Sequence, residues 1–414
     1  MNLTRIMLGF AVGLVTVVSS TLFSSPRATA VVTRPATGTT LQAAALSTVA
    51  GYGRHTAGGR GGRRVLVTNR KDSGLGSLRH ALEHAGGHRI VRFRVAGVIA
   101  LQTPIRIKHP YITVKGGSAP RGGVEIRGNP ILVVTHDVIL KNLRLRPGDA
   151  MMSSSEAGQA DGLTVNGVGG NVYNVVLDHL SLLWGPDIGG LAVLGNVHDM
   201  TVQYTIMGEG LRYSRHPEAA PSGDGHSMAV NLAPLSSSSL APHRITFYRN
   251  LFTTSNARMP RLEGVSCVDL VNNVIYNWGQ HAGTGNPRSA NIVNNWFRMG
   301  PHKGTHDWWL PQTSGDLPKK FRDSVYTHGN HRDGFRGGRA PDSVVYAGTP
   351  RCGGVSKRPW PVNTVFFSVL SNVGARMPTL DSVDRRVIRN VRQRDGKYFN
   401  GVGFPAPNPY WPSL

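Results

Sequence analysis

Two arginines flank a proline in the stretch 256–264, which reads N-A-R-M-P-R-L-E-G. A guanidinium group presents a planar fork of N–H donors that can bind a carboxylate in bidentate fashion. Arg258 and Arg261, on either side of Pro260, therefore suit the recognition of an acidic ligand. The structural alternative is that both arginines pair with acidic side chains on neighbouring segments of the fold.

The residues of this stretch do not distinguish ligand binding from structural ion pairing, so its position along the chain must be considered. The tetrapeptide Ala-Arg-Met-Pro occurs again at 375–378. The first copy stands between two short apolar runs at 245–252 and 268–275, whereas the second leads into a helical pattern. Proline interrupts strand pairing, so the sequence predicts a rigid loop between two strands that directs Arg258 and Arg261 outward.

Short strand-like runs repeat along the chain and must position these side chains. Five of them align on one pattern, at 175–182, 201–208, 245–252, 268–275 and 291–297. Their aligned residues are separated by 25, 45, 23 and 22 positions and are His179, Tyr204, Arg249, Asn272 and Asn294. A period in the low twenties with short, β-branched strands indicates a solenoid of stacked coils. The predicted fold is all-β, a right-handed parallel β-helix.

A column of asparagines supports this fold. Asn250, Asn273 and Asn295 occupy the next position of successive repeats. Each amide can donate to one neighbour and accept from the other, so we expect a hydrogen-bonded ladder along one turn of the solenoid.

Two helical segments are expected outside this repeat. A short N-terminal helix is predicted at 77–83, with Ser77 as its N-cap. A second helix is predicted after Asp381, with an apolar stripe at 383, 387, 388 and 391. This C-terminal helix is expected to pack on the outside of the solenoid.

Composition narrows the classes of function. The chain of 414 residues carries a net charge of +23 and only 23 acidic residues. Such a surface attracts polyanions, and we expect an acidic polysaccharide rather than nucleic acid. Its two cysteines, Cys267 and Cys352, lack metal-type spacing. They form either one disulfide or two buried thiols.

The first thirty residues have the features of an export signal. Arg5 precedes an apolar run at 6–18, and Ala28 and Ala30 give the small-x-small form of a cleavage site. The alternative is a single membrane anchor, for which the apolar run is short. We therefore predict a secreted, extracellular protein with no membrane contact after cleavage.

The rest of the chain divides into two parts at this level. A Gly-, Ala- and Arg-rich segment at 31–62 is expected to be flexible. The domain at 63–414 is expected to be the β-helix, and we expect it to be a monomer.

A series of phrases in fixed order carries a family resemblance. The phrases are G-Y-G-R-H-T-A-G-G-R-G-G from 51, V-T-N-R-K-D-S-G-L-G-S-L-R from 67, L-R-L-R-P-G-D at 143–149, V-V-L-D-H at 175–179, T-V-Q-Y-T-I-M-G-E-G-L at 201–211, G-D-G-H-S-M at 223–228, N-A-R-M-P-R-L at 256–262, V-N-N-V-I-Y-N-W-G at 271–279 and V-G-A-R-M-P-T-L-D-S-V-D-R-R-V at 373–387. Taken together they resemble the pectate lyases of polysaccharide lyase family one, in their secreted microbial form.

The resemblance implies an enzyme that cleaves polygalacturonate by β-elimination and gives 4,5-unsaturated oligogalacturonides. It implies Arg258 as the base that removes the C5 proton, which requires a lowered arginine pKa. It implies that Arg261 holds the substrate carboxylate. Glu263 departs from the family, which commonly carries an arginine five residues after the base, and this puts substrate binding in doubt.

The resemblance also implies a Ca²⁺ cofactor, because the charged uronate needs neutralising. Asp161 and Asp187 lie where the family carries calcium ligands, and Glu156 is predicted to add a third carboxylate. Gln159 and Ile188 stand where related chains commonly carry acids. We expect a weakened calcium site that substrate carboxylates complete.

The resemblance further implies substrate contacts at Arg212 and His226, on the coil after the calcium loops. Two rival functions stay open from the sequence. One is a non-catalytic β-helix that binds polyanions. The other is a β-helical glycoside hydrolase, which needs two or three carboxylates at one site and is disfavoured because the chain has no adjacent Asp pair.

Overall fold

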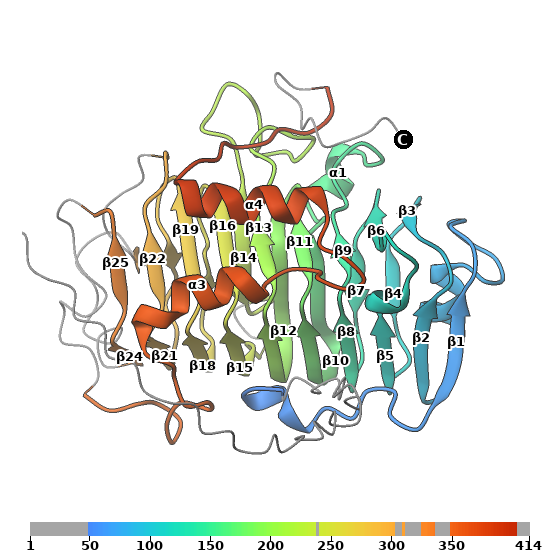
Figure 1. The fold of residues 1–414 in the computed structure, drawn as a ribbon, viewed down its shortest axis with the longest axis horizontal. Helices are drawn as coiled ribbons and strands as arrows, with labels where there is room; N and C mark the ends of the chain where they lie inside the picture. The colour runs from blue at the N-terminus through green and yellow to red at the C-terminus, as the bar shows by residue number, and fades with distance from the viewer. Residues whose placement is uncertain (1–48, 237–239, 303–308, 311–323, 336–347, 404–414) are drawn as a thin grey trace, which may run out of the picture. The chain divides into compact units, whose positions relative to one another are not determined.

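The computed structural model describes residues 49–236, 240–302, 309–310, 324–335 and 348–403. The predicted signal at 1–30 lies outside the described residues, as does most of the predicted flexible segment. In the described part the chain winds into coils that each contribute short parallel strands to three faces (Figure 1). The predicted right-handed parallel β-helix is confirmed.

Two of the faces belong to one 16-stranded sheet, because β10 and β12 are long strands that turn a corner and join them. The first face contains β1 (Arg63–Val67), β2 (Arg89–Phe93), β5 (Ile112–Lys115), β8 (Val138–Lys141), the second halves of β10 (Leu163–Asp178) and β12 (Ile188–Gln203), β15 (His243–Tyr248), β18 (Ser266–Val271), β21 (Ala290–Val293) and β24 (Val325–His328). The second face contains β4 (Ile105–Ile107), β7 (Ile131–Val133), the first halves of β10 and β12, β14 (Met228–Ala233), β17 (Arg261–Leu262), β20 (Gly283–Thr284) and β23 (Trp309–Leu310).

The third face is a separate nine-stranded sheet. Its strands are β3 (Gly97–Ala100), β6 (Val124–Arg127), β9 (Arg144–Leu145), β11 (Ser181–Leu183), β13 (Ile206–Gly208), β16 (Leu251–Ser255), β19 (Val274–Trp278), β22 (Trp296–Arg298) and β25 (His331–Asp333). All strand pairs in both sheets are parallel, and equivalent residues of successive coils stack on one another, with register shifts inside the β10–β12 and β12–β14 pairs.

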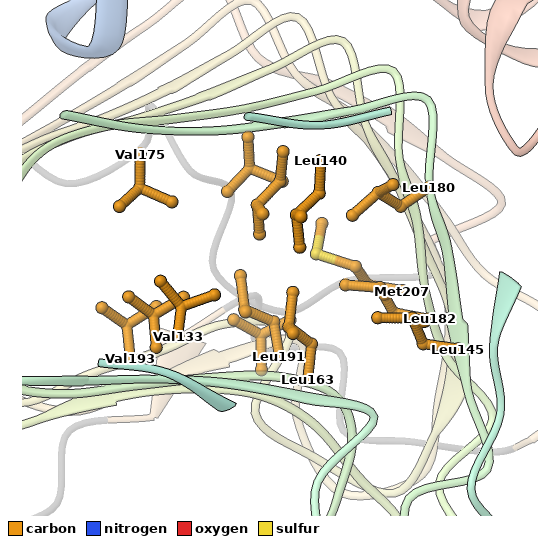
Figure 2. Packing of buried hydrophobic residues seen from close by; sticks show 14 of the residues in the cluster. Val133, Leu140, Leu145, Leu163, Val175, Leu180, Leu182, Leu191, Val193 and Met207 are labelled. Atoms are coloured by element: carbon orange, nitrogen blue, oxygen red, sulfur yellow. The ribbon is translucent and has the colours of Figure 1, made fainter. Parts of the chain in front are cut away.

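The interior of the solenoid is apolar, since alternate residues of each strand point inward. Figure 2 shows aliphatic side chains from all three faces meeting there, among them Val175, Leu163 and Leu182. These three side chains are fully buried. Burial of each such side chain contributes about 1.5–3 kcal/mol, and the stacked coils form one continuous core.

The predicted asparagine ladder is present and extends one rung further than expected. The side-chain oxygen of Asn273 accepts from the backbone N–H of Asn250 at 2.9 Å and from its side-chain amide at 3.1 Å. Asn295 accepts in the same way from Asn273, and Asn330 from Asn295. The column before the ladder, which the repeat aligned, turns the chain with positive φ at His179, Tyr204, Arg249, Asn272 and Asn294.

Residues 49–62 lie against the first face. They include a 3₁₀ helix, η1 (Tyr52–His55), whose backbone N–H groups bond outward-facing threonines. Tyr52 donates to Thr246 Oγ1 at 3.2 Å and Gly53 donates to Thr201 Oγ1 at 2.9 Å. The sequence grouped these residues with the flexible segment 31–62, whereas the structure packs them against the solenoid.

Helices lie outside the solenoid, as predicted for the C-terminal one. Helix α4 (Ser382–Gln393) begins after Asp381, whose side chain accepts from the N–H of Asp384. Its apolar stripe packs on the third face together with α3 (Val362–Asn372), which the sequence did not predict (Figure 1). The predicted N-terminal helix is present at 78–84, after Ser77, whose Oγ accepts from the N–H of His80, and its last part is a π-helical turn, η2 (His80–His84). Short turns α1 (Ser154–Ala157) and η3 (Gly116–Ser118) complete the elements.

Two further expectations concern the cysteines and a possible membrane span. Cys267 and Cys352 form a disulfide, with their Cα atoms 5.6 Å apart, which settles the alternative left open by the sequence. No helix within the described ranges is long and apolar enough to cross a membrane.

Candidate active site

Four chemically active side chains converge because their turns are equivalent. Asp161, Asp187, His226 and Arg258 each lie just before a strand of the second face: β10, β12, β14 and β17, respectively. These four strands are consecutive neighbours in the sheet. Parallel strands in register stack their starting points at one edge, so segments distant in sequence meet there.

The two aspartates form the inner part of the site. Asp161 is buried, with 3 % of its surface exposed, and accepts a hydrogen bond from Thr164 Oγ1 at 2.6 Å. Burial, followed by the nearby charge of Asp187, raises the pKa of Asp161 well above its usual range. Asp187 is half-buried and lies nearer the surface.

Two stacked histidines flank Asp187. Nε2 of His226 lies 3.3 Å from Asp187 Oδ1, and Nε2 of His216 lies 3.7 Å from the same atom. The two rings stack with centroids 4.1 Å apart. Burial, then the neighbouring His226, lowers the pKa of His216. In the described part of the chain these three residues are grouped closely enough to hold a metal ion.

A pocket of about 300 Å³ opens onto this cluster. Its lining residues are Gly158, Asp187, His216, Pro217, Glu218, His226 and Arg258. Arginine, carboxylates and imidazoles therefore face one small polar cavity, which suits a charged ligand better than an apolar one.

Arg258 enters the pocket from a strained turn. Its φ of 60° lies in the left-handed region, which is unusual for a residue with a Cβ. Burial, then the adjacent charge of Arg261, lowers the pKa of Arg258, and Asp187 acts in the opposite direction. His281, on the next coil, is buried, and burial together with Arg258 lowers its pKa to about 4.

Arg261 is the first residue of β17 and is already engaged. Its Nη1 donates to Asn231 Oδ1 at 3.2 Å, and its Nη2 lies 3.6 Å from Glu263 Oε2. Glu263, the departure noted in the sequence, therefore competes for the guanidinium that is predicted to hold a substrate carboxylate.

Arg212 lies in a second pocket, also of about 300 Å³. Its guanidinium stands over the rings of Tyr213 and Tyr398, 5.2 and 5.0 Å from their centroids. The pocket also includes Asn256 and His302, and the His302 ring stacks on Tyr398 at 3.8 Å. Aromatic rings beside an arginine suit a sugar ring that carries a carboxylate. A backbone hydrogen bond links residues of the two pockets: the carbonyl oxygen of Arg212 accepts from the N–H of His226 at 2.7 Å.

Glu156 is placed away from these groups. It is exposed, and its carboxylate accepts from the backbone and hydroxyl of Ser153 in a capping box at the start of α1. These hydrogen bonds lower its pKa. The side chain predicted as a third calcium ligand is thus committed to a helix cap and does not line the pocket.

The donor set does not fit calcium. Calcium takes six to eight oxygen ligands, but two imidazole nitrogens lie 3.3 and 3.7 Å from Asp187 Oδ1. Ile188 offers no side-chain oxygen, and Asp161 is buried with its pKa raised. Asp187, His216 and His226 could together hold a metal ion, but their donor atoms are not those that calcium prefers.

Sequence comparisons agree with the resemblance seen in the motifs. The chain is 32 % identical over 258 residues to a probable pectate lyase C of Aspergillus flavus, covering 61 % of this chain and 53 % of the relative. It is 30 % identical over 253 residues to a probable pectate lyase C of Emericella nidulans, covering 61 % and 52 %. The chain thus spans about half the length of the curated relatives it matches. No protein-family model matches it.

Structural comparisons establish the fold class. A crystal structure of jun a 1, the major allergen from cedar pollen, superposes with a TM-score of 0.57 at 17 % identity, covering 78 % of this chain and 92 % of that one. A pectate lyase bound to a hexasaccharide gives a TM-score of 0.57 at 14 % identity, covering 79 % and 97 %. The chain has the parallel β-helix of the pectate lyases, and its recognition as pectate-lyase-like is confirmed.

Proposed function

We propose that the protein is a secreted lyase that cleaves polygalacturonate by β-elimination, acting as a monomer on this acidic polysaccharide. One observation carries the proposal. Arg258 lies in the pocket with Asp187, and burial together with Arg261 lowers its pKa. A lowered pKa is the condition under which an arginine can accept a proton, so this environment suits the role of base.

The proposed chemistry needs two tasks from the chain. Arg261 binds the uronate carboxylate, which first requires the guanidinium to part from Glu263. Neutral Arg258 then removes the C5 proton, the C5–H electrons form the C4–C5 double bond, and the glycosidic oxygen leaves from C4 and is protonated by water. The hydroxide left by that water takes the proton from Arg258. Arg212 between its tyrosines is proposed to hold another uronate unit of the same polymer.

Calcium remains a prediction from the resemblance. The resemblance assigns it to Asp161, Asp187 and Glu156, but the residues present do not fit calcium, because Glu156 caps α1 and Asp187 is flanked by two imidazoles. The activity assay on polygalacturonate should therefore be run in parallel with calcium, with other divalent ions and with a chelator.

The test is the release of unsaturated oligogalacturonides from polygalacturonate, followed by their ultraviolet absorbance. We expect product from polygalacturonate and less from a fully methylated polymer, which lacks the carboxylate that Arg261 is proposed to bind. No product with any uronate polymer under any of these ionic conditions would contradict the proposal.

A second candidate function has a specific observation in its favour. The Arg261–Glu263 pair already satisfies the proposed carboxylate receptor. A non-catalytic protein that binds polyanions through its positive charge would tolerate this pair. Retention on a polygalacturonate matrix without release of unsaturated product would support that function instead.

A further inference from the structure

We infer that Asp187, His216 and His226 form a binding site for a borderline first-row divalent metal ion such as Zn²⁺, with an open position that faces the Arg258 pocket. The site differs from the expected calcium site in its donors. It needs no catalytic activity to exist, so it can be tested whether or not the lyase proposal holds.

The spacing of the donor atoms is close to what such an ion requires. Ligand atoms about 2.0–2.1 Å from a tetrahedral Zn²⁺ lie roughly 3.3 Å from one another. Nε2 of His226 and Nε2 of His216 lie 3.3 and 3.7 Å from Asp187 Oδ1. All three donor atoms fall within 4.8 Å of one another, so small side-chain adjustments bring them to one ion.

The two imidazoles are held in place before any ion binds. His216 and His226 are 8 % and 3 % exposed, and their rings stack. Burial and stacking limit the rotamers of both rings, so little side-chain entropy is lost when an ion binds. Such preorganisation separates this cluster from histidines that lie singly on the surface.

Groups behind the two histidines would have to adjust when an ion binds. On the far side of His226, the exposed Glu218 carboxylate lies 3.8 Å from Nδ1, which is beyond hydrogen-bond distance, so it would have to move closer to orient a metal-bound His226. His216 differs, because its Nδ1 accepts the N–H of Glu218 at 3.0 Å. Metal binding through Nε2 moves the ring proton of His216 to Nδ1. We therefore expect the turn at 216–218 to shift when the ion binds.

The donor chemistry selects the class of ion. Two imidazoles and one carboxylate suit Zn²⁺, Co²⁺, Ni²⁺ or Fe²⁺, whereas calcium and magnesium prefer oxygen ligands. Three protein ligands leave a coordination position for water or for an oxygen of a bound molecule. That position faces a pocket that Arg258 also lines, so an anionic ligand would meet a metal ion and a guanidinium together.

The experiment uses the untagged full-length chain after treatment with a chelator and dialysis. Co²⁺ is titrated and followed by its visible absorption, and Zn²⁺ and Ca²⁺ are titrated separately by calorimetry. We expect one equivalent of Co²⁺, which Zn²⁺ displaces and Ca²⁺ does not. In His226→Gln and Asp187→Asn we expect the affinity for Zn²⁺ to fall by on the order of 100-fold.

A matched control is provided by a second stacked histidine pair. His198 and His243 stack at 4.9 Å, and His198 Nδ1 lies 2.8 Å from Asp199 Oδ2. His243→Gln should leave the affinity unchanged. The metal-free variants are compared by circular dichroism. Should His226→Gln fail to fold, Asp187→Asn, a smaller change, decides. The inference is overturned if the chain binds no stoichiometric Co²⁺ or Zn²⁺, or if a folded variant binds them as tightly as the parent chain.

Discussion

The two copies of Ala-Arg-Met-Pro have the same sequence and opposite surroundings. The first copy, at 257–260, precedes β17 on the second face, and the second copy, at 375–378, lies between α3 and α4. Both arginines are half-buried, and both Met–Pro bonds are cis. The tetrapeptide therefore sets a similar local backbone feature at both places.

The neighbours of the two copies differ. Arg258 has positive φ and shares a pocket with Asp187, His216 and His226. Around the second copy the contacts are those of a docked helix: Ala375 donates to Asp384 at 3.1 Å. The position in the fold, and not the tetrapeptide sequence, therefore places Arg258 in a polar pocket and Arg376 at the junction between α3 and α4.

The largest expected difference between the copies is in activity. Replacement Arg258→Ala should lower kcat/KM on polygalacturonate by about 10³-fold, or ~4 kcal/mol, because a proton-transfer group is lost. The matched Arg376→Ala should change kcat/KM less than about twofold, since that side chain makes one long hydrogen bond, to Val373 O at 3.4 Å. Initial rates of unsaturated product measure both. Equal losses in the two variants would remove the distinction between the copies.

The second copy should matter for stability instead. Asp384 and Arg146 are fully buried and 2.8 Å apart. Asp384→Ala should lower the free energy of unfolding by about 3 kcal/mol, because it leaves a buried guanidinium short of one partner. Urea unfolding measures the loss. Arg389→Ala, at an exposed position of α4, serves as the control and should have an effect below about 0.5 kcal/mol.

The first copy should make the fold sensitive to acid through His281. Its pKa is 6.5 in the unfolded chain and about 4 when folded. Between these two pKa values the unfolded chain binds a proton at His281 that the folded chain does not. The free energy of unfolding is therefore highest above pH 6.5 and decreases as the pH falls toward 4. Comparing unfolding free energies at pH 7 and pH 4.5, His281→Gln should show a smaller difference than the parent chain by roughly 2 kcal/mol. An unchanged difference would mean that His281 titrates normally.

The smallest expected effect concerns the ion pair beside the first copy. Glu263→Gln should free Arg261 for substrate and lower KM for polygalacturonate by about threefold, since a partly exposed pair with a 3.6 Å separation contributes below about 1 kcal/mol. The change should shrink in high salt, which screens the pair, and kcat should stay the same. A rise in KM would show that Glu263 positions Arg261 for substrate.

The fold was largely predictable because the strand-like runs recur in the sequence with the period of one coil. The asparagine column fixed the register, and the stripe of α4 matched the observed burial at Val383, Val387 and Val391. Helix α3 was missed because its β-branched and aromatic residues favour strands locally, and its packing on the third face decides instead. Sequence patterns do not record such tertiary packing.

The site was predictable only in part. Equivalent positions on successive coils bring Asp161, Asp187 and Arg258 together, and this follows from the repeat. His216 was missed because its partner Asp187 comes from another coil, and its spacing to His226, in the same segment between β13 and β14, has no metal signature. The role of Glu156 had a signal that was not used, since Ser153 three residues earlier makes a capping box.

The asparagine ladder has a consequence for how such a chain can change in length. Each rung receives hydrogen bonds from the coil before it and gives them to the coil after it. Loss or duplication of one whole coil, such as residues 273–294, joins equivalent positions, so the rungs that are present stay paired. Loss of a few residues inside a coil would leave buried amides unmatched, at about 1–3 kcal/mol each. The ladder thus makes the coil the unit in which this fold can gain or lose material.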